Sequence, residues 1–197
     1  MLKCWGYNGT GQLGDGMTTD KHSPPAGGVD FGGPIGTYNV ACGGGHTCAR
    51  LAGFNVECWG ANDMGQLGDG TRTQRLTPVP AIGMDGGVSR VAAGDGFTCV
   101  RMDFGAVECW GDNTWGQVGD RTSITRLEHE PVFELMDEMD FEITAGSDHA
   151  CAIKEPNTAY CWGANFYGQL GNETTSRKPP VRVEGLGGAV ETASAGG

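Results

Sequence analysis

Residues 58–70 read Cys58-Trp59-Gly60-Ala61-Asn62-Asp63-Met64-Gly65-Gln66-Leu67-Gly68-Asp69-Gly70, and this stretch decides the fold because near-copies of it occur three more times. The copies begin at Cys4, Cys109 and Cys161, at successive steps of 54, 51 and 52 residues. Each copy keeps the pattern Cys-Trp-Gly-x-Asn-x-x-Gly-Gln-[Leu/Val]-Gly. A period near 50 residues indicates stacked supersecondary units, either blades of a propeller or turns of a solenoid.

Each repeat unit contains four short apolar segments, seen in one unit at residues 38–43, 46–50, 55–60 and 78–80. The second and third alternate like a hairpin, and the fourth is marked by prolines, which are typical of an outer edge strand. The first segment combines small and β-branched residues, so we expect it near a shared axis. Four antiparallel strands per unit predict an all-β propeller blade, and the one candidate helical turn lies at residues 134–139.

The whole chain of 197 residues is expected to form a single propeller-repeat domain, because repeats share cores with their neighbours. The expected parts are a partial blade at 1–37, blades at about 38–87, 88–140 and 141–188, and a partial strand at 189–197. Two arrangements remain open. Either head and tail meet in one incomplete fourth blade, or the chain is an interior piece of a longer array with further repeats at its ends.

Six of the eight cysteines fall in pairs ten residues apart with turn-forming residues between them. In a hairpin centred on those turns each pair lies directly across on one face, which predicts three disulfides. Zinc is the alternative, but the short Cys-x2-Cys spacing is missing. Disulfides favour an oxidising compartment and hence an extracellular or cell-surface location. The paired residues are Cys48 and Cys58, Cys99 and Cys109, and Cys151 and Cys161, which leaves Cys4 and Cys42 over.

The formal net charge of −11 is unfavourable for nucleic-acid binding, which depends on clusters of Lys and Arg that neutralise phosphates. The negative charge is compatible with binding a basic protein partner or a cation, and equally with a role only in keeping the surface soluble. The sequence holds no apolar run long enough for a membrane span. Residues 1–4 lead directly into the repeat without the apolar region of a signal peptide, so we expect a removed leader or an absent upstream part.

The motif Cys-Trp-Gly-x-Asn-x-x-Gly-Gln-Leu-Gly-Asp-Gly, preceded by Gly-x-x-His-Thr-Cys-Ala, resembles the regulator-of-chromosome-condensation repeat family. The resemblance covers essentially the whole chain and implies a β-propeller, seven-bladed in complete members, of which about four repeats are present here. Founding nuclear members promote nucleotide exchange on a small GTPase and bind chromatin, and bacterial members include secreted inhibitors of β-lactamases. The cysteine-bearing repeats of this chain resemble the extracellular bacterial branch.

Most repeated side chains are interpreted as framework. We expect the four Trp at 5, 59, 110 and 162 to wedge between blades, and His46 and His149 to be structural because Phe97 replaces them in another unit. The repeated Asn and Gln residues are expected to satisfy the backbone of a turn. Asp15-Gly16 and Asp69-Gly70 resemble parts of a calcium loop, but the alternating acidic positions and the terminal Glu are missing.

Two positions inside the motif do not repeat, and they carry the candidate binding residues. They read Gly9-Thr10, Asp63-Met64, Thr114-Trp115 and Phe166-Tyr167 in the four copies. Large apolar residues there are not required by the repeat, which is typical of an interaction face. The alternative is that these rings only cover neighbouring blades. The candidate residues are Met64, Trp115, Phe166 and Tyr167.

The chain shows no motif for catalysis, such as a nucleophile elbow, a Walker loop or a zinc motif, and none that calls for a cofactor. The leading hypothesis is therefore a non-enzymatic, secreted or cell-surface module that binds another protein through loops on one propeller face. One alternative is a metal-dependent lyase or hydrolase at the propeller mouth, using His22, His129 and the acidic segment 128–142. Another alternative is guanine-nucleotide exchange on a small GTPase.

Overall fold

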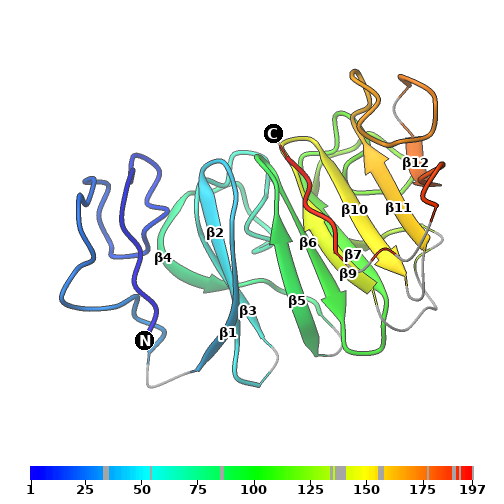
Figure 1. The fold of residues 1–197 in the computed structure, drawn as a ribbon. Helices are drawn as coiled ribbons and strands as arrows, with labels where there is room; N and C mark the ends of the chain where they lie inside the picture. The colour runs from blue at the N-terminus through cyan, green and yellow to red at the C-terminus, as the bar shows by residue number, and fades with distance from the viewer. Residues whose placement is uncertain are drawn as a thin grey trace.

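The computed structural model describes residues 1–32, 36–53, 55–84, 87–133, 135, 141–154, 158–176, 178–187, 190 and 192–196. Within these residues the chain forms three four-stranded antiparallel sheets and no helix, which confirms the all-β prediction. Figure 1 shows the sheets standing side by side, with the N-terminal segment beyond the first sheet. None of the described residues forms a helix with the length and hydropathy that a bilayer crossing needs.

Each sheet is one blade with its strands in sequence order from the inner to the outer edge. The strands are β1 (Thr37–Cys42), β2 (His46–Leu51), β3 (Val56–Gly60), β4 (Arg75–Pro80), β5 (Val88–Ala93), β6 (Phe97–Met102), β7 (Val107–Gly111), β8 (Arg126–Pro131), β9 (Phe141–Ala145), β10 (His149–Lys154), β11 (Thr158–Gly163) and β12 (Lys178–Arg182). Blade 1 is β1 to β4, blade 2 is β5 to β8 and blade 3 is β9 to β12. The N-terminal segment before β1 adds an isolated bridge between Gly6 and Lys21.

The inner strands lie beside one another, as their small residues predict. The backbone N–H of Val91 in β5 donates to the Asn39 side chain of β1 at 2.6 Å, and the N–H of Gly44 donates to the carbonyl of Gly94 at 3.3 Å. At the C-terminal end, the N–H of Ala195 donates to the Thr144 hydroxyl of β9 at 3.1 Å. Successive inner strands are thus linked along a common axis.

The third strand of each blade ends at a glycine because the chain turns sharply there. Gly60 has a φ of 106°, in the left-handed region, and a Cβ at this residue would lie 2.5 Å from the carbonyl oxygen of Gly45. Gly111 and Gly163 occupy the same place with φ of 102° and 103°. The Gly of Cys-Trp-Gly therefore starts the loop that carries the rest of the motif.

The fourth strand begins earlier than its prolines suggest, and this corrects the predicted boundaries. β4 runs from Arg75 to Pro80, whereas the sequence pattern placed this segment at 78–80, and β8 likewise begins at Arg126, five residues before Pro131. Both strands begin at an arginine that forms an ion pair with an aspartate of the preceding loop, Asp69 for β4 and Asp120 for β8. Pro24 and Pro25 lie in no strand. Most of the candidate helical turn at 134–139 lies outside the described residues.

Three of the four motif tryptophans form the contacts between blades, as predicted. Trp59, Trp110 and Trp162 are fully buried, and each indole N–H donates to a glutamine carbonyl in the preceding motif loop, at 2.8, 2.9 and 2.8 Å. The prediction is wrong for Trp5, which is 57% exposed. The other three indoles donate to a motif loop of the preceding unit, and among the described residues no such loop packs over Trp5.

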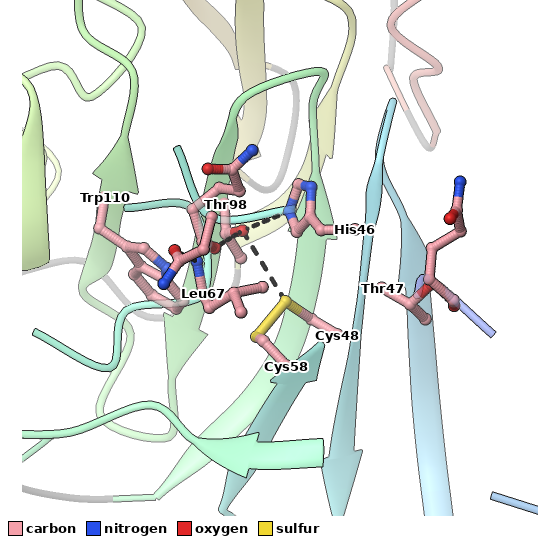
Figure 2. Close-up of a disulfide and its surroundings, with 10 residues drawn as sticks. His46, Thr47, Cys48, Cys58, Leu67, Thr98 and Trp110 are labelled. Carbon is pink, nitrogen blue, oxygen red and sulfur yellow. Dashed lines mark hydrogen bonds between the residues drawn. A yellow bond between two sulfur atoms is a disulfide. The ribbon is translucent and has the colours of Figure 1, made fainter. Parts of the chain in front are cut away.

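The three predicted disulfides are present, one in each central hairpin, and Figure 2 shows the Cys48–Cys58 bond of blade 1. Cys48 and Cys58 face each other directly in the β2–β3 register with their Cα atoms 4.1 Å apart, and the other two pairs repeat this geometry. These six sulfur atoms are therefore not thiolate ligands for zinc. Cys4 is half-buried and Cys42 exposed, and both are free thiols.

Candidate interaction face

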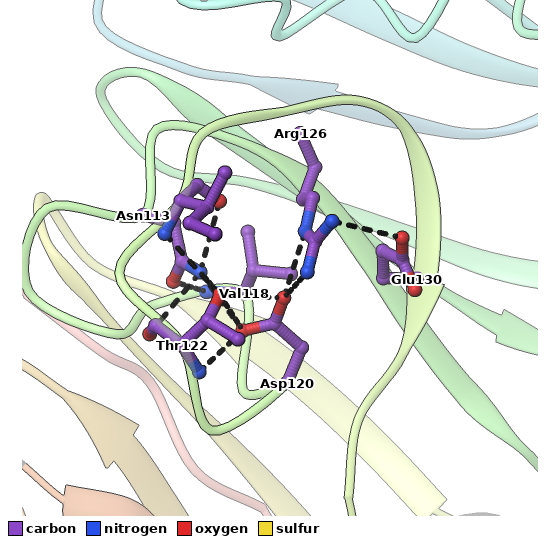
Figure 3. A network of polar contacts seen from close by, with 7 residues as sticks. Asn113, Val118, Asp120, Thr122, Arg126 and Glu130 are labelled. Atoms are coloured by element: carbon purple, nitrogen blue, oxygen red, sulfur yellow. Dashed lines mark hydrogen bonds and ion pairs between the residues drawn. The ribbon is translucent and has the colours of Figure 1, made fainter.

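The loop after each third strand is built around the motif asparagine, as Figure 3 shows for blade 2. The Asn113 amide donates to the Asp120 carboxylate at 2.9 Å and to the carbonyls of Thr122 and Ile124 at 3.3 and 3.2 Å. Its side-chain oxygen accepts the N–H of Val118 at 3.0 Å. Asn8, Asn62 and Asn165 make the matching bonds in their own copies. The predicted turn-forming role of these residues is confirmed.

An acidic residue closes the same loop against the outer strand. Asp120 lies 2.6 Å from the Arg126 guanidinium at the start of β8 and accepts from the Thr122 hydroxyl at 2.8 Å. Burial raises the pKa of Asp120, but these hydrogen bonds together outweigh burial, so the pKa lies below its usual value. Asp69 and Arg75 repeat the pair in blade 1 at 2.8 Å. Asp69, whose Asp-Gly sequence resembles part of a calcium loop, therefore binds Thr71 and Arg75 of its own blade.

The motif glutamine holds the two unrepeated residues at the tip of the loop. The Gln66 side-chain oxygen accepts the N–H of Met64 at 2.9 Å, and the Gln117 oxygen accepts the N–H of Trp115 at 2.8 Å. Gln169 does the same for Tyr167 at 3.0 Å. The backbone beneath each candidate binding residue is therefore fixed by the repeat, while its side chain differs from copy to copy.

These loops lie at the same end of the blades as the turns between the first two strands. The N–H groups of Ala61, Asp112 and Ala164 donate at 2.8 Å to the carbonyls of residues in those turns, which are Gly45, Gly96 and Asp148. We call this end of the molecule the motif face. It comprises the loops 8–20, 61–74, 112–125 and 164–176 and the turns 43–45, 94–96 and 146–148.

The four candidate residues all lie on the motif face, and the structure brings two of them into contact. The rings of Trp115 and Phe166 meet edge to face with their centroids 4.6 Å apart. Phe166 is 54% exposed and Tyr167 94% exposed, whereas Trp115 is half-buried. Met64, 37% exposed, lies one loop away beside Gly96. The Trp115–Phe166 pair thus joins the loops of blades 2 and 3.

Three acidic residues of the motif face were missed at the sequence level. Asp95 and Asp148 lie in the turns that follow the innermost strands of blades 2 and 3, and the N–H of Asp95 donates to the Ser147 carbonyl at 3.0 Å. Asp112 follows β7, and its N–H donates to the carbonyl of Gly96, next to Asp95. Burial raises the pKa of Asp148, and the negative charges of Asp95 and Asp112 raise it further. A sequence signal exists for Asp148, because Gly45 and Gly96 occupy its place in the other blades.

The histidines fall into two groups. His46 is buried between blades, where burial lowers its pKa to about 4, and burial also lowers the pKa of the half-buried His149. His129 lies on the outer strand β8, with Nδ1 2.7 Å from the Glu108 carboxylate, and His22 lies in the N-terminal segment. Among the described residues no three His, Cys, Asp or Glu side chains are grouped as a metal site would require.

Two family models described as regulator of chromosome condensation (RCC1) repeat match the chain, one over residues 56–101 and 157–197 and one over residues 142–169. The ultraviolet-B receptor UVR8 of Arabidopsis thaliana is 30% identical over 197 residues, which are 98% of this chain and 44% of the receptor. The probable E3 ubiquitin-protein ligase HERC4 of Rattus norvegicus is 34% identical over 161 residues, 80% of this chain and 15% of the ligase. The chain thus spans less than half the length of these curated relatives.

Two solved structures have the same fold. Human WBSCR16 matches with a TM-score of 0.85 at 25% identity, over 98% of this chain and 50% of its own. Prp20p of Saccharomyces cerevisiae matches with a TM-score of 0.81 at 19% identity, over 99% of this chain and 49% of its own. Both are β-propellers of the same repeat type. Because matches to this repeat cover more than half of the chain and its blades superimpose on such propellers, the chain belongs to the regulator of chromosome condensation (RCC1) repeat family.

Proposed function

We propose that this chain is a non-enzymatic, secreted or cell-surface module that binds another protein through the motif face. The residues that contact the partner are Met64, Trp115, Phe166 and Tyr167. The observation that carries the proposal is the Trp115–Phe166 ring pair, which bridges two blades at positions where the repeat requires no aromatic residue.

The physical reason lies in the rigidity of these positions. Gln117 and the asparagine bonds fix the backbone under Trp115, and the edge-to-face contact restricts both rings before any partner arrives. Large aromatic anchors that are already ordered lose little conformational entropy on binding. Tyr167, which is almost fully exposed, adds a ring with a polar end of the kind enriched in interfaces.

Solved relatives support the class of function. Prp20p binds Gsp1p and histones, and a second structure contains yeast RCC1 (Prp20) bound to Kap60. A propeller of this repeat type can therefore bind several other proteins. The secreted or cell-surface part of the proposal rests on the three disulfides, since such bonds persist in oxidising compartments.

A peptide-display selection tests the proposed face. Random peptides are selected on the oxidised chain, and the dissociation constants of the enriched peptides are measured by fluorescence anisotropy for wild type, Phe166→Ala and Tyr167→Ala. We expect each substitution to weaken binding by about tenfold or more, because interface anchors contribute about 2 kcal/mol. Melting temperatures are expected to stay within about 2 °C of wild type, because both side chains are exposed.

The matched control is Phe104→Ala. Phe104 is 52% exposed in the turn between β6 and β7, at the opposite end of blade 2, so its removal deletes a comparable ring from the other face. Binding by this variant should equal that of wild type. If Phe166→Ala lowers the melting temperature strongly and no enriched peptide depends on Phe166 or Tyr167, the rings only cover neighbouring blades and the proposal is wrong.

A further inference from the structure

Negative charge predominates on the motif face. Its loops and turns carry nine acidic residues and two arginines among the described positions. The acidic residues are Asp15, Asp20, Asp63, Asp69, Asp95, Asp112, Asp120, Asp148 and Glu173, and the arginines are Arg72 and Arg121. Three of the acids, at 15, 69 and 120, are paired with Lys21, Arg75 and Arg126 toward the outer strands. The rest of the face keeps an excess of acid over base.

The inner acidic group, defined as Asp95, Asp112 and Asp148, is the part of this face in which the charges of Asp95 and Asp112 act on a neighbouring carboxyl, that of Asp148. In the part of the chain that the structure describes, no salt bridge joins any of the three to a basic side chain. Asp112 accepts from the Thr114 hydroxyl and, at 3.1 Å, from the Gln117 amide, which orient the carboxylate without neutralising it. Like charges held together in this way are relieved by a cation.

The inner acidic group and the aromatic pair are neighbours on the motif face. Gln117 links them, because its side-chain oxygen holds the backbone of Trp115 while its amide reaches Asp112. A Cβ at Gly163 would lie 3.3 Å from the Gln117 Cα and 2.6 Å from the Asp148 carbonyl, so the loop of Trp115 packs against the turn of Asp148. On the other side, the side chains of Met64 and Asp112 both flank Gly96.

We propose that the partner segment bound at the motif face presents a lysine or arginine, whose charged end lies against Asp95, Asp112 and Asp148 while its alkyl chain lies along Trp115 and Phe166. This inference rests on the proposed function and specifies the chemistry of the partner. Carboxylates beside an aromatic ring suit such a side chain, because the ring face attracts a cation and packs against its methylene groups. An acidic segment would be repelled from the same place.

The peptides enriched on the motif face provide the test. We expect them to contain more Lys and Arg than the starting library, and we expect replacement of these residues by Gln to weaken binding by about tenfold. The double variant Asp95→Asn with Asp148→Asn should weaken binding of the parent peptides by a similar factor. Raising NaCl from about 50 to about 300 mM should weaken binding to wild type but have much less effect on the double variant.

Asp103→Asn is the matched control, since Asp103 is an exposed acid in the turn at the opposite end of blade 2. It removes a charge without touching the motif face, and binding should stay within about twofold of wild type. Peptides that depend on Phe166 and Tyr167 but lack basic residues, and that bind the double variant as well as wild type, would overturn this inference and leave the proposed function standing. If no enriched peptide depends on Phe166 or Tyr167, both are wrong.

Discussion

His46 lies at a repeat position where another unit has an apolar ring, but its imidazole can make the stability of the fold depend on pH. Its ring lies between blades 1 and 2, with Nε2 2.8 Å from the Thr98 hydroxyl, which in turn donates to the Gln66 carbonyl at 2.8 Å (Figure 2). The hydroxyl therefore accepts from His46, and the imidazole is neutral. Phe97 occupies the same position in blade 2 without such a bond.

His46→Phe should remove a pH dependence of stability. The pKa of His46 is about 4 in the folded protein, against an ordinary 6.5, so the unfolded chain takes up a proton that the folded chain does not. Stability is therefore complete above pH 6.5 and is lost as the pH falls toward 4. Between about pH 7 and about pH 5 the loss from this residue is roughly 2 kcal/mol.

Urea unfolding at the two pH values measures the effect. Wild type should lose stability at the lower pH, and His46→Phe should lose much less. His149→Phe serves as the comparison, because His149 is only half-buried and its substitution should remove less of the pH dependence. An identical loss in wild type and His46→Phe would show that His46 does not titrate with unfolding.

At the level of elements, the central hairpin of each blade combines a local turn with a cross-strand bond. Cys99 and Cys109 are directly opposite in the β6–β7 register, and this pairing could be predicted because both the spacing and the turn lie within eleven residues. The outer strand behaves differently. β4 begins at Arg75, which pairs with Asp69 of the preceding loop, so the prolines alone placed this strand too late.

Removal of one hairpin disulfide should destabilise the fold without changing it. Cys99→Ala with Cys109→Ala opens a loop of about eleven residues, for which the chain-entropy account gives a loss of roughly 2.5 to 3 kcal/mol. Urea unfolding measures the loss, and the corresponding double variant at Cys48 and Cys58 should lose a similar amount. Thiol counting in denatured, unreduced wild type should find two free thiols, from Cys4 and Cys42. Eight would contradict both the pairing and the proposed oxidising compartment.

At the level of the whole molecule, stability depends on how each blade packs against the one before it. Trp110 is buried between blades 1 and 2, within a cluster that includes Leu67 of the preceding loop and Val91 of the inner strand. Its N–H bond to the Gln66 carbonyl satisfies its polar atom. Trp5 occupies the same motif position but is largely exposed, since none of the described blades packs over it.

Trp110→Ala and Trp5→Ala should therefore lower the free energy of unfolding by very different amounts. Loss of the buried indole should cost about 3 to 5 kcal/mol of unfolding free energy, because it leaves a large cavity between blades. Loss of the exposed indole should cost less than about 0.5 kcal/mol. Chemical unfolding followed by far-ultraviolet circular dichroism measures both without relying on tryptophan emission. Equal losses would show that the motif tryptophan acts within its own unit.

The amino-acid sequence by itself determined the features that recur in every unit: the strands, the hairpin disulfides and the Asn-based loop. These features depend on contacts within one period or on the same contact made again in the next. The tertiary structure decided which unrepeated residues meet. Trp115 joins Phe166, and Asp148 joins Asp95 and Asp112, only because stacked blades bring residues about fifty positions apart to one face. The spacing of residues along the chain does not by itself predict those contacts.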